Sequence, residues 1–290
     1  MSWSLALTAN LEVSLAGFSE RLKAAHIPHR ISEARGEQQV WVADEPTAAL
    51  VRELYQAFLA NPDPGFTAVN AISKPISQPL WQKLRRFPAV ITILLLTLAV
   101  ALWTQLGTSL TAVAQLSFNA IVFEGDEAYL VSLAYSLEQG QWWRLITPML
   151  LHFGWLHLAM NSLWFWELGR RIELHQGSWF VLVFTLVSAL VSNVSQFWFS
   201  GPVLFGGLSG VLYALLGFCW IYQRINPVAA YNLPKGVVGM MLVWLVLCLV
   251  GVVSAMGFGQ IANAAHVSGL VLGCVAGAVM GVLNKLKVSE

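Results

Sequence analysis

The segment GGLSGVLYALLG places one serine, Ser209, in an otherwise apolar stretch. His152, His157, Asn161 and His266 lie in two other apolar stretches. A serine becomes an effective nucleophile when a neighbouring histidine takes its proton. Histidine and asparagine side chains can also donate hydrogen bonds to a developing oxyanion. These residue types predict acyl-transfer chemistry, provided that the fold brings them together.

Other hydrolytic chemistries fit these residues less well. A metalloprotease of the H-E-x-x-H type is excluded because His152 and His157 are five residues apart, about 140° around a helix, with no carboxylate near them. An aspartyl enzyme needs two membrane aspartates, and no apolar span contains one. The soluble hydrolase elbow G-x-S-x-G fails because Val211 replaces its second glycine. Glu167 and Glu173 lie too far along their span to orient His266, so a dyad without a third acid remains.

The composition is that of a membrane protein, with 57% hydrophobic residues, 11% charged residues and a mean hydropathy of +0.65. The net charge of +1 disfavours nucleic acid as the main partner. All three cysteines lie in apolar runs, which favours buried thiols over disulfides or a metal site. No cleavable signal peptide is expected, because the amino terminus lacks a basic start.

Three regions are expected: a soluble cytoplasmic α+β domain over residues 1–65, a linker over 66–86, and a six-helix membrane domain over 87–286. In the first, GFSERLKAAHI has helical periodicity, and HRISEARGEQQVWV predicts two strands around an Arg-Gly turn. A second helix is predicted to begin at Asp44 and to stop before Pro62.

Six membrane spans are predicted, each about long enough to cross a hydrocarbon core of about 30 Å. They are residues 88–106, 145–167, 179–199, 207–225, 236–257 and 264–284. Lysine and arginine gather in the loops on one side, whereas the opposite loops contain mainly acids and a single arginine, Arg144. The positive-inside rule therefore places both termini in the cytoplasm. The predicted fold class is an all-α polytopic membrane protein with a small soluble α+β amino-terminal domain.

The five polar residues lie on spans two, four and six, which run in the same direction. His152, Ser209 and His266 fall in the first halves of their spans, and His157 and Asn161 lie past the middle of span two. All five are expected at one depth, near the extracytoplasmic face. His157 and Asn161 are four residues apart and share a helix face. A stripe of glycines follows His266 at helical spacing and predicts close packing against the helix of Ser209. These glycines are Gly269, Gly273 and Gly277.

Each of these residues also has a purely structural interpretation. A single membrane serine often packs against a neighbouring helix, and a buried histidine can be satisfied by a carbonyl group. His157 and Asn161 could form an interhelical hydrogen-bond clamp. Placing several polar side chains at one depth in lipid nevertheless has a free-energy cost of roughly 3 kcal/mol for each ionisable side chain. Since small apolar residues would pack at lower cost, a shared site is the preferred interpretation.

Four segments resemble motifs of the rhomboid family of intramembrane serine proteases. GGLSGVLYA resembles the family's G-x-S-G motif, and AHVSGLVLG resembles its A-H-x-x-G-x-x-x-G motif. LLHFGWLHLAMN resembles the H-x-x-x-N element of span two, and WWRLITPMLLH resembles the Trp-Arg signature of the first outer loop. The motifs occur in the family's order over about residues 88–284. The resemblance implies a six-span bundle with Ser209 as nucleophile and His266 as general base.

The resemblance also implies supporting roles and a substrate class. His157, Asn161 and the Ser209 backbone N–H would form an oxyanion hole, assisted by Gly207. Tyr213 would stack on His266, and Trp143 with Arg144 would anchor the first outer loop. The implied activity is cleavage of transmembrane segments near the extracytoplasmic face of a bacterial inner membrane through an acyl-enzyme. No cofactor or metal is implied, and the sequence does not determine the natural substrate or the oligomeric state.

Two departures from the family pattern concern water access and gating. Pro148 stands where members often carry a histidine, beside Ser192 and Gln196 of a water-retention site. The loop before span six, AMGFGQIANAAH, also differs in length. Two alternatives stay open, a catalytically silent protein that binds transmembrane helices and a transporter with proton-relaying histidines. The sequence has no internal repeat and no broken helix pairs, which disfavours a transporter.

Overall fold

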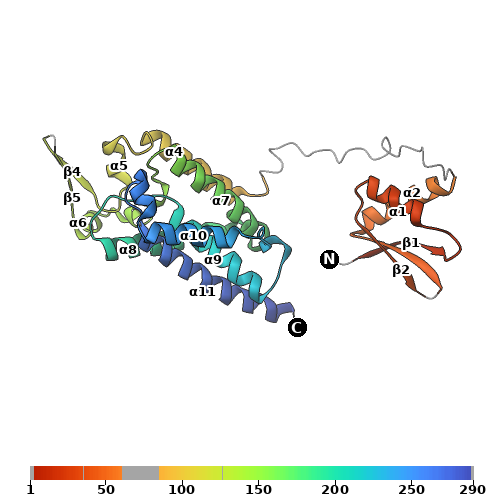
Figure 1. The fold of residues 1–290 in the computed structure, drawn as a ribbon. Helices are drawn as coiled ribbons and strands as arrows, with labels where there is room; N and C mark the ends of the chain where they lie inside the picture. The colour runs from red at the N-terminus through yellow and green to blue at the C-terminus, as the bar shows by residue number, and fades with distance from the viewer. Residues whose placement is uncertain (1–2, 35, 61–84, 126, 289–290) are drawn as a thin grey trace. The chain divides into compact units, whose positions relative to one another are not determined.

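The computed structural model of the chain describes residues 3–34, 36–60, 85–125 and 127–288. They belong to two compact units, Met1–Gln78 and Pro79–Glu290. Most of the predicted linker, residues 66–84, lies outside the described residues. Each unit is considered by itself (Figure 1).

The amino-terminal unit is a three-stranded antiparallel sheet with two helices. Its elements are β1 (Ser4–Asn10), α1 (Ala16–Ala24), β2 (His29–Ala34), β3 (Glu37–Val42) and α2 (Glu45–Ala60), and the strand order is β1-β3-β2. The core is built from Phe18 and Leu22 of α1, Val40 and Val42 of β3, and Val51 of α2. The two predicted helices and the predicted strand pair are confirmed.

Asp44 begins α2 by accepting a hydrogen bond from the Thr47 N–H, with an Oδ1–N distance of 2.8 Å. Strand β1 was not predicted. Its register shifts between Leu5 and Leu7, and its buried positions, Ala6 and Ala9, are small. The bulge interrupts the alternation of large apolar and polar residues by which a strand is recognised.

The carboxy-terminal unit is a helical bundle with a short hairpin at one end. Its main helices are α4 (Pro88–Trp103), α7 (Trp155–Gln176), α8 (Ser178–Ser200), α9 (Ser209–Ile225), α10 (Val237–Leu249) and α11 (Asn263–Val288). The smaller elements are α5 (Leu110–Leu116), β4 (Ile121–Glu124), β5 (Glu127–Leu130), α6 (Leu133–Glu138), η2 (Trp142–Leu145), η3 (Thr147–Leu150), η4 (Ala229–Tyr231) and η5 (Ser254–Phe258). Figure 1 shows α5, the β4–β5 hairpin and α6 gathered at the end of this unit opposite the carboxy terminus.

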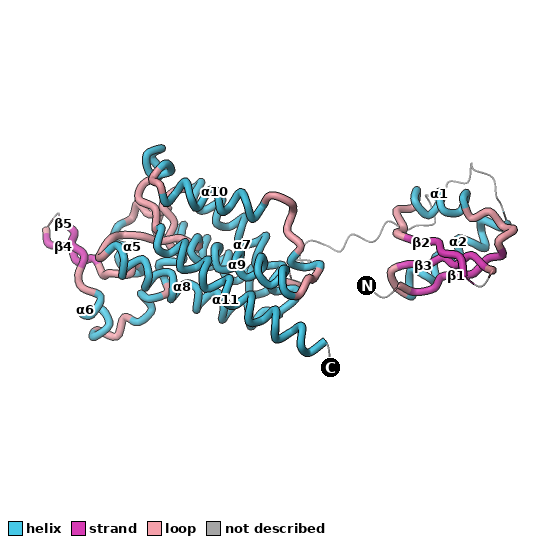
Figure 2. Tube along the Cα trace, turned by 60° about the horizontal axis from the view of Figure 1, so that its bottom comes forward, coloured by secondary structure: helices cyan, strands magenta, loops and turns pink. Residues whose placement is uncertain are grey.

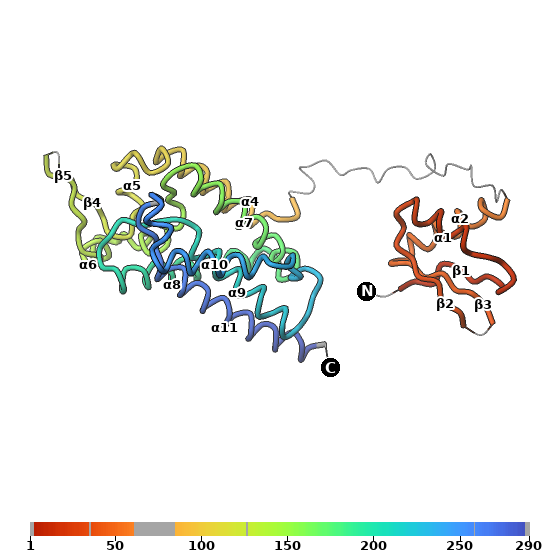
Figure 3. Tube along the Cα trace, viewed as in Figure 1, coloured from red at the N-terminus to blue at the C-terminus, as the bar shows by residue number. Residues whose placement is uncertain are grey.

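Helix α9 is the central element of the bundle. Every residue from Gly210 to Cys219 is buried, and α9 lies between α7 and α11 (Figure 3). Helix α10 runs along the outer edge of the unit (Figure 2) and buries only Met241, Leu245 and Cys248. The bundle therefore holds α9 from several sides, whereas α10 has a largely exposed surface.

The α9–α11 contact depends on glycine. A Cβ atom at Gly269, Gly273 or Gly277 would lie well inside the van der Waals contact distance from a carbonyl oxygen on α9. Those oxygens belong to Gly210, Ala214 and Phe218. The predicted pairing of the glycine stripe with the helix of Ser209 is confirmed, because the two backbones approach more closely than any side chain would allow.

The bounds predicted for two spans are wrong. The second helix begins at Trp155 rather than at residue 145, because the preceding segment forms the short turns η2 and η3 around Pro148. The fifth helix ends at Leu249, and Gly251 follows it with a φ of +79°. Hydropathy measures how apolar these segments are, and it does not distinguish a helix from a turn. Helix α5, the hairpin and α6 occupy residues that were predicted only as an outer loop.

Among the described residues, two helices are long and apolar enough to cross a membrane, Ser178–Ser200 and Asn263–Lys287. Two shorter helices, Pro88–Trp103 and Val237–Leu249, are also apolar. The amino-terminal end of Pro88–Trp103 is held by Glu173, whose carboxylate oxygens accept hydrogen bonds from the N–H groups of Ala89 and Val90 at 2.8 and 3.0 Å. A carboxylate at this end of a helix also interacts favourably with the helix dipole.

Candidate active site

Ser209 and His266 lie in direct hydrogen-bonding contact. Ser209 is the first residue of α9, and its Oγ lies 2.7 Å from Nε2 of His266 on the first turn of α11. His266 is 6% exposed, and its Nδ1 has no hydrogen-bond partner among the described residues. No carboxylate therefore orients the imidazole in the part of the chain that the structure describes. The pair has the geometry of a nucleophile and its base without a third acid.

Tyr213 lies one turn after Ser209 on α9 and contacts the other side of the pair. Its ring centroid is 5.0 Å from that of His266, with an angle of 43° between the ring planes. Its hydroxyl donates a hydrogen bond to the Met241 carbonyl oxygen of α10 at 3.1 Å. The tyrosine thus fixes one face of the imidazole and connects α9 to the outer helix α10.

His157 and Asn161 converge on the backbone just before Ser209. A Cβ atom at Gly207 would lie 2.7 Å from Nε2 of His157 and 3.6 Å from Nδ2 of Asn161. Gly207 also has a φ of +121°, which side-chain-bearing residues rarely adopt. Glycine at this position therefore permits both the turn into α9 and the close approach of the two nitrogen atoms.

The tautomer of His157 follows from its contacts. Its Nδ1 lies 3.5 Å from the Phe153 backbone N–H, which can only donate. With Nδ1 as the acceptor, the ring proton is assigned to Nε2, the atom that faces Gly207. Both nitrogen atoms near Gly207 are then hydrogen-bond donors, as an oxyanion hole requires.

His152 does not belong to this group of donors. It precedes α7 instead of lying on it, and its Nδ1 bonds to the Leu150 carbonyl oxygen at 3.1 Å. Its ring contacts the ring of His157, with 4.9 Å between centroids. His152 is therefore a neighbour of His157, and among the described residues no hydrogen bond or ring contact joins it to the serine–histidine pair.

A small cavity, about the size of one water molecule, lies beside Ser209. Ser192 and Asn193 of α8 supply its polar lining, and Ser192 Oγ has no partner among the described residues. Gln196 lies one turn further along α8 and accepts a hydrogen bond from the Ala265 N–H at 3.2 Å. Pro148 is connected to the residues before Ser209 through its backbone: its carbonyl oxygen accepts a hydrogen bond from the Gly207 N–H at 2.9 Å.

Sequence reasoning missed Asn193. Its Nδ2 donates to the carbonyl oxygens of Leu145 and Ile146 at 2.9 and 3.3 Å, and so connects α8 to the turns that precede α7. The signal was present, because an amide in a membrane span has the same cost that singled out Asn161. The acceptors of Asn193 could not be predicted, because residues 145 and 146 were expected in a helix, where their carbonyl groups would bond within the helix.

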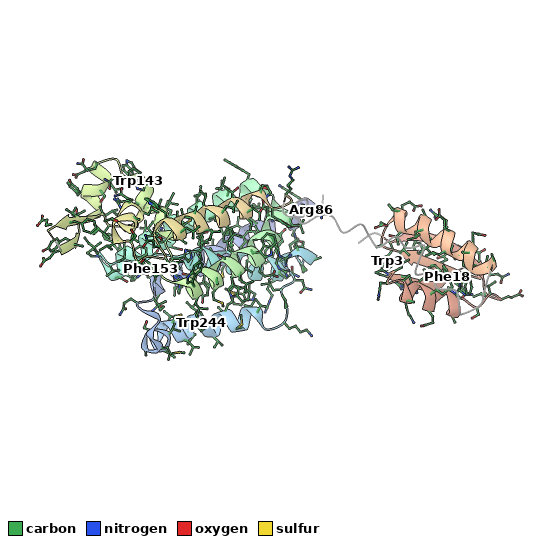
Figure 4. All side chains as sticks on the ribbon, turned by 90° about the horizontal axis from the view of Figure 1, so that it is seen from above. Trp3, Phe18, Arg86, Trp143, Phe153 and Trp244 are labelled. Atoms are coloured by element: carbon green, nitrogen blue, oxygen red, sulfur yellow. The ribbon has the colours of Figure 1, made fainter. Side chains whose placement is uncertain are left out.

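Trp143 and Arg144 bind the end of α5. Trp143 Nε1 donates to the Gln115 carbonyl oxygen at 3.0 Å, and one Arg144 nitrogen donates to the carbonyl oxygens of Ala114 and Ser117, each at 2.8 Å. Burial lowers the pKa of Arg144 from its ordinary value, and the carbonyl oxygens replace its lost water. Figure 4 places Trp143 near one end of the unit and Phe153 further in. Trp143 and Arg144 therefore connect η2 to the end of α5.

The described residues contain no group of three or more histidine, cysteine, aspartate or glutamate side chains that could hold a metal ion.

Both units of the chain match known families. A family model described as Rhomboid domain matches residues 139–282, and one described as Rhomboid N-terminal domain matches residues 1–64. A Photorhabdus laumondii protein named Rhomboid protease GlpG is 35% identical over 260 residues, which cover 86% of this chain and 84% of the relative. Proteins of the same name from Salmonella newport and Salmonella typhi are 34% and 33% identical, with 88% of this chain and 89% of each relative covered.

Proposed function

The chain belongs to the rhomboid family and is an intramembrane serine protease, and from this premise we propose that Ser209 and His266 are its catalytic dyad. The observation that carries the proposal is the distance of 2.7 Å between Ser209 Oγ and His266 Nε2 at the start of two tightly packed helices. Rhomboid proteases act on membrane protein substrates within the lipid bilayer.

In the proposed mechanism, neutral His266 accepts the hydroxyl proton as Ser209 Oγ attacks the carbonyl carbon of the scissile peptide bond. The resulting imidazolium gives this proton to the leaving amine, the C–N bond breaks, and the acyl chain stays on Oγ as an ester. A water molecule then attacks the ester while His266 takes one of its protons. The return of that proton to Oγ releases the new carboxyl end and restores the enzyme.

The oxyanion of each tetrahedral intermediate is proposed to bind near Gly207. His157 Nε2 and Asn161 Nδ2 converge there, and the Ser209 backbone N–H is one of the unpaired donors at the start of α9. The positive end of the helix dipole adds to this stabilisation. A single preorganised donor of this kind is typically worth about 3 kcal/mol in the transition state.

The proposed membrane arrangement has six spans, with both termini in the cytoplasm and the site open to the extracytoplasmic side of a bacterial inner membrane. In this arrangement residues 1–65 form a cytoplasmic domain, 66–86 a linker and 87–286 the membrane protease. His157, Ser209 and His266 each lie within the first turn of a long helix, which supports one depth for the site. Substrates would be cut near the outer edge of a transmembrane segment, at small or helix-breaking residues, because helical carbonyl groups are shielded by their own hydrogen bonds.

Labelling by a fluorophosphonate in detergent micelles tests the dyad directly. The modified residue is located by mass spectrometry, and cleavage of a model transmembrane substrate is measured on the same samples. We expect an adduct on Ser209 that is lost, together with cleavage, in Ser209→Ala and in His266→Ala. Ser268→Ala is the matched control. Ser268 lies two residues after His266, and among the described residues its hydroxyl bonds to the Ala265 carbonyl oxygen alone.

The same experiment separates the protease from a catalytically silent protein that binds transmembrane helices. If a folded sample gives neither an adduct nor cleavage, the result supports the catalytically silent protein and contradicts the assignment of Ser209 and His266 as a catalytic dyad. An adduct on another serine, retained in Ser209→Ala, would contradict the assignment of the nucleophile.

A further inference from the structure

A polar cluster lies at the end of α9 opposite the proposed dyad. At its centre is Tyr222, a fully buried tyrosine thirteen residues after Ser209, which corresponds to about 20 Å along the helix. Three nitrogen atoms surround its hydroxyl oxygen. They belong to His175 in the last turn of α7, Asn226 just after α9, and Asn284 near the end of α11.

The distances make all three contacts hydrogen bonds. Asn284 Nδ2 lies 3.0 Å from the Tyr222 oxygen, Asn226 Nδ2 lies 3.2 Å from it, and His175 Nε2 lies 3.1 Å from it. The hydroxyl thus connects segments that are far apart in the sequence, at the ends of α7, α9 and α11. Closer to Ser209, α9 and α11 are joined by the close backbone contacts at Gly269, Gly273 and Gly277, which we call the glycine seam.

A count of protons fixes the state of His175. A phenolic oxygen has two lone pairs and one proton. The two asparagine Nδ2 groups can only donate, so they occupy both lone pairs. The Tyr222 proton must then go to His175 Nε2, which has to be unprotonated, with the ring proton on Nδ1. A second proton on the ring would place two donors against each other and break this bond.

The surroundings of His175 allow protons to reach it from water. His175 is exposed, whereas its partner Tyr222 is buried. The Tyr231 ring of η4 packs edge-on against both, at 5.2 Å from the His175 centroid and 4.8 Å from that of Tyr222. The charged and titratable groups on the surrounding elements are Arg171 with its partner Glu167 on α7, the Cys219 thiol on α9, the Tyr231 hydroxyl on η4 and Lys285, which follows Asn284 on α11.

We propose that His175 and Tyr222 form a proton-sensitive latch at this end of the bundle. While the imidazole is neutral, the latch ties α7 to α9 and, through Asn284, to α11. When the imidazole is protonated, the bond opens and the attachment of these helix ends weakens. In the membrane arrangement proposed above the latch faces the cytoplasm, so it would respond to cytoplasmic acidification. Its operation does not depend on which residues are catalytic.

A double-mutant cycle at two pH values tests the latch. The full chain, Tyr222→Phe, His175→Phe and the double variant are unfolded reversibly by SDS in mixed micelles, at about pH 8 and about pH 5, on either side of the ordinary histidine pKa of about 6.5. Phenylalanine keeps an aromatic ring at both positions. Tyr222→Phe also removes the hydrogen bonds from Asn226 and Asn284, and the cycle isolates the part of the loss that depends on His175. We expect a coupling of about fivefold in the unfolding equilibrium constant at the higher pH, as for one net hydrogen bond, and none at the lower pH.

Two further variants make the result specific. His175→Gln offers an acceptor that does not titrate, and it should reduce the difference in stability between the two pH values. Tyr135→Phe removes a hydroxyl from an exposed tyrosine of the same unit and should have the same small effect at both pH values. A coupling of equal size at both pH values, or no coupling at either, would overturn the proposal.

Discussion

Gly269 on α11 lies so close to Gly210 on α9 that a Cβ atom on Gly269 would overlap the Gly210 carbonyl oxygen. Gly210 directly follows Ser209, and Gly269 lies three residues after His266. The close contact of the two backbones is thus one turn or less from the hydrogen bond between serine and histidine. The glycine seam is the structural cause of the short distance in the proposed dyad.

Gly269→Ala should separate the two helices. Because the new methyl group would meet backbone, which cannot move aside as a flexible side chain would, we expect a loss of about 2 kcal/mol in the free energy of unfolding. Fluorophosphonate labelling of Ser209 should fall as well. Unfolding in SDS mixed micelles and labelling of the folded fraction measure the two effects. Gly239→Ala on α10 is the matched control, since a Cβ atom there would meet no atom within 4 Å. Equal effects of the two alanines would contradict the role of the seam.

Removal of either proposed oxyanion donor should slow cleavage while the protein stays folded. For His157→Ala and for Asn161→Ala we expect kcat to fall about 10²-fold to 10³-fold, with a much smaller change in KM, because the donors act on charge that develops in the transition state. Cleavage kinetics on a transmembrane substrate in proteoliposomes provide both constants. A rise in KM at unchanged kcat would show that these side chains bind substrate and do not stabilise the oxyanion.

Arg144→Ala should destabilise the first outer loop. Its guanidinium is buried and donates to two carbonyl oxygens at the end of α5, each of which would lose this charged donor. We expect a loss of about 2 kcal/mol in the free energy of unfolding. Arg170→Ala, which breaks an ion pair with Glu167 that is partly exposed, should cost at most about 1 kcal/mol. The two variants are compared by SDS unfolding, and equal costs would show that the buried contacts of Arg144 do not matter.

The start of α2 should be sensitive to acid. Hydrogen bonds from Thr47 hold the pKa of Asp44 below its ordinary value. A carboxyl group with a lowered folded-state pKa stabilises the fold above its unfolded value of about 3.9, and this contribution is lost as pH falls through the folded value. Exchange of the Thr47 amide hydrogen, followed as the pH is lowered, should report the loss. Asp44→Asn keeps the acceptor without the charge, so its residual acid sensitivity should be smaller. Identical profiles would exclude Asp44 as the cause.

Local patterns in the sequence determined the main helices and the residues that carry the proposed chemistry. The spacing of His266 and the glycines after it already placed them on one face of a helix, because helical periodicity is a property of a short segment. The cost of polar groups in apolar segments singled out Ser209, His157 and Asn161 in the same way. Hydropathy likewise located α4, α8 and α11 within a few residues of their observed bounds.

Only the tertiary structure decided where a buried apolar segment stops being a helix. Residues 145–154 are as apolar as a span, yet they form turns. Asn193 donates a hydrogen bond to these turns, and the Pro148 carbonyl oxygen within them accepts one from the Gly207 N–H. The hydrogen-bond partners of Tyr222 are His175 on α7, Asn226 just after α9 and Asn284 on α11. They lie close together only because of the way in which these helices cross. Hydropathy measures transfer out of water and takes no account of direction. Hydrogen bonds between distant segments depend on distance and angle, which are set only when the whole bundle has packed.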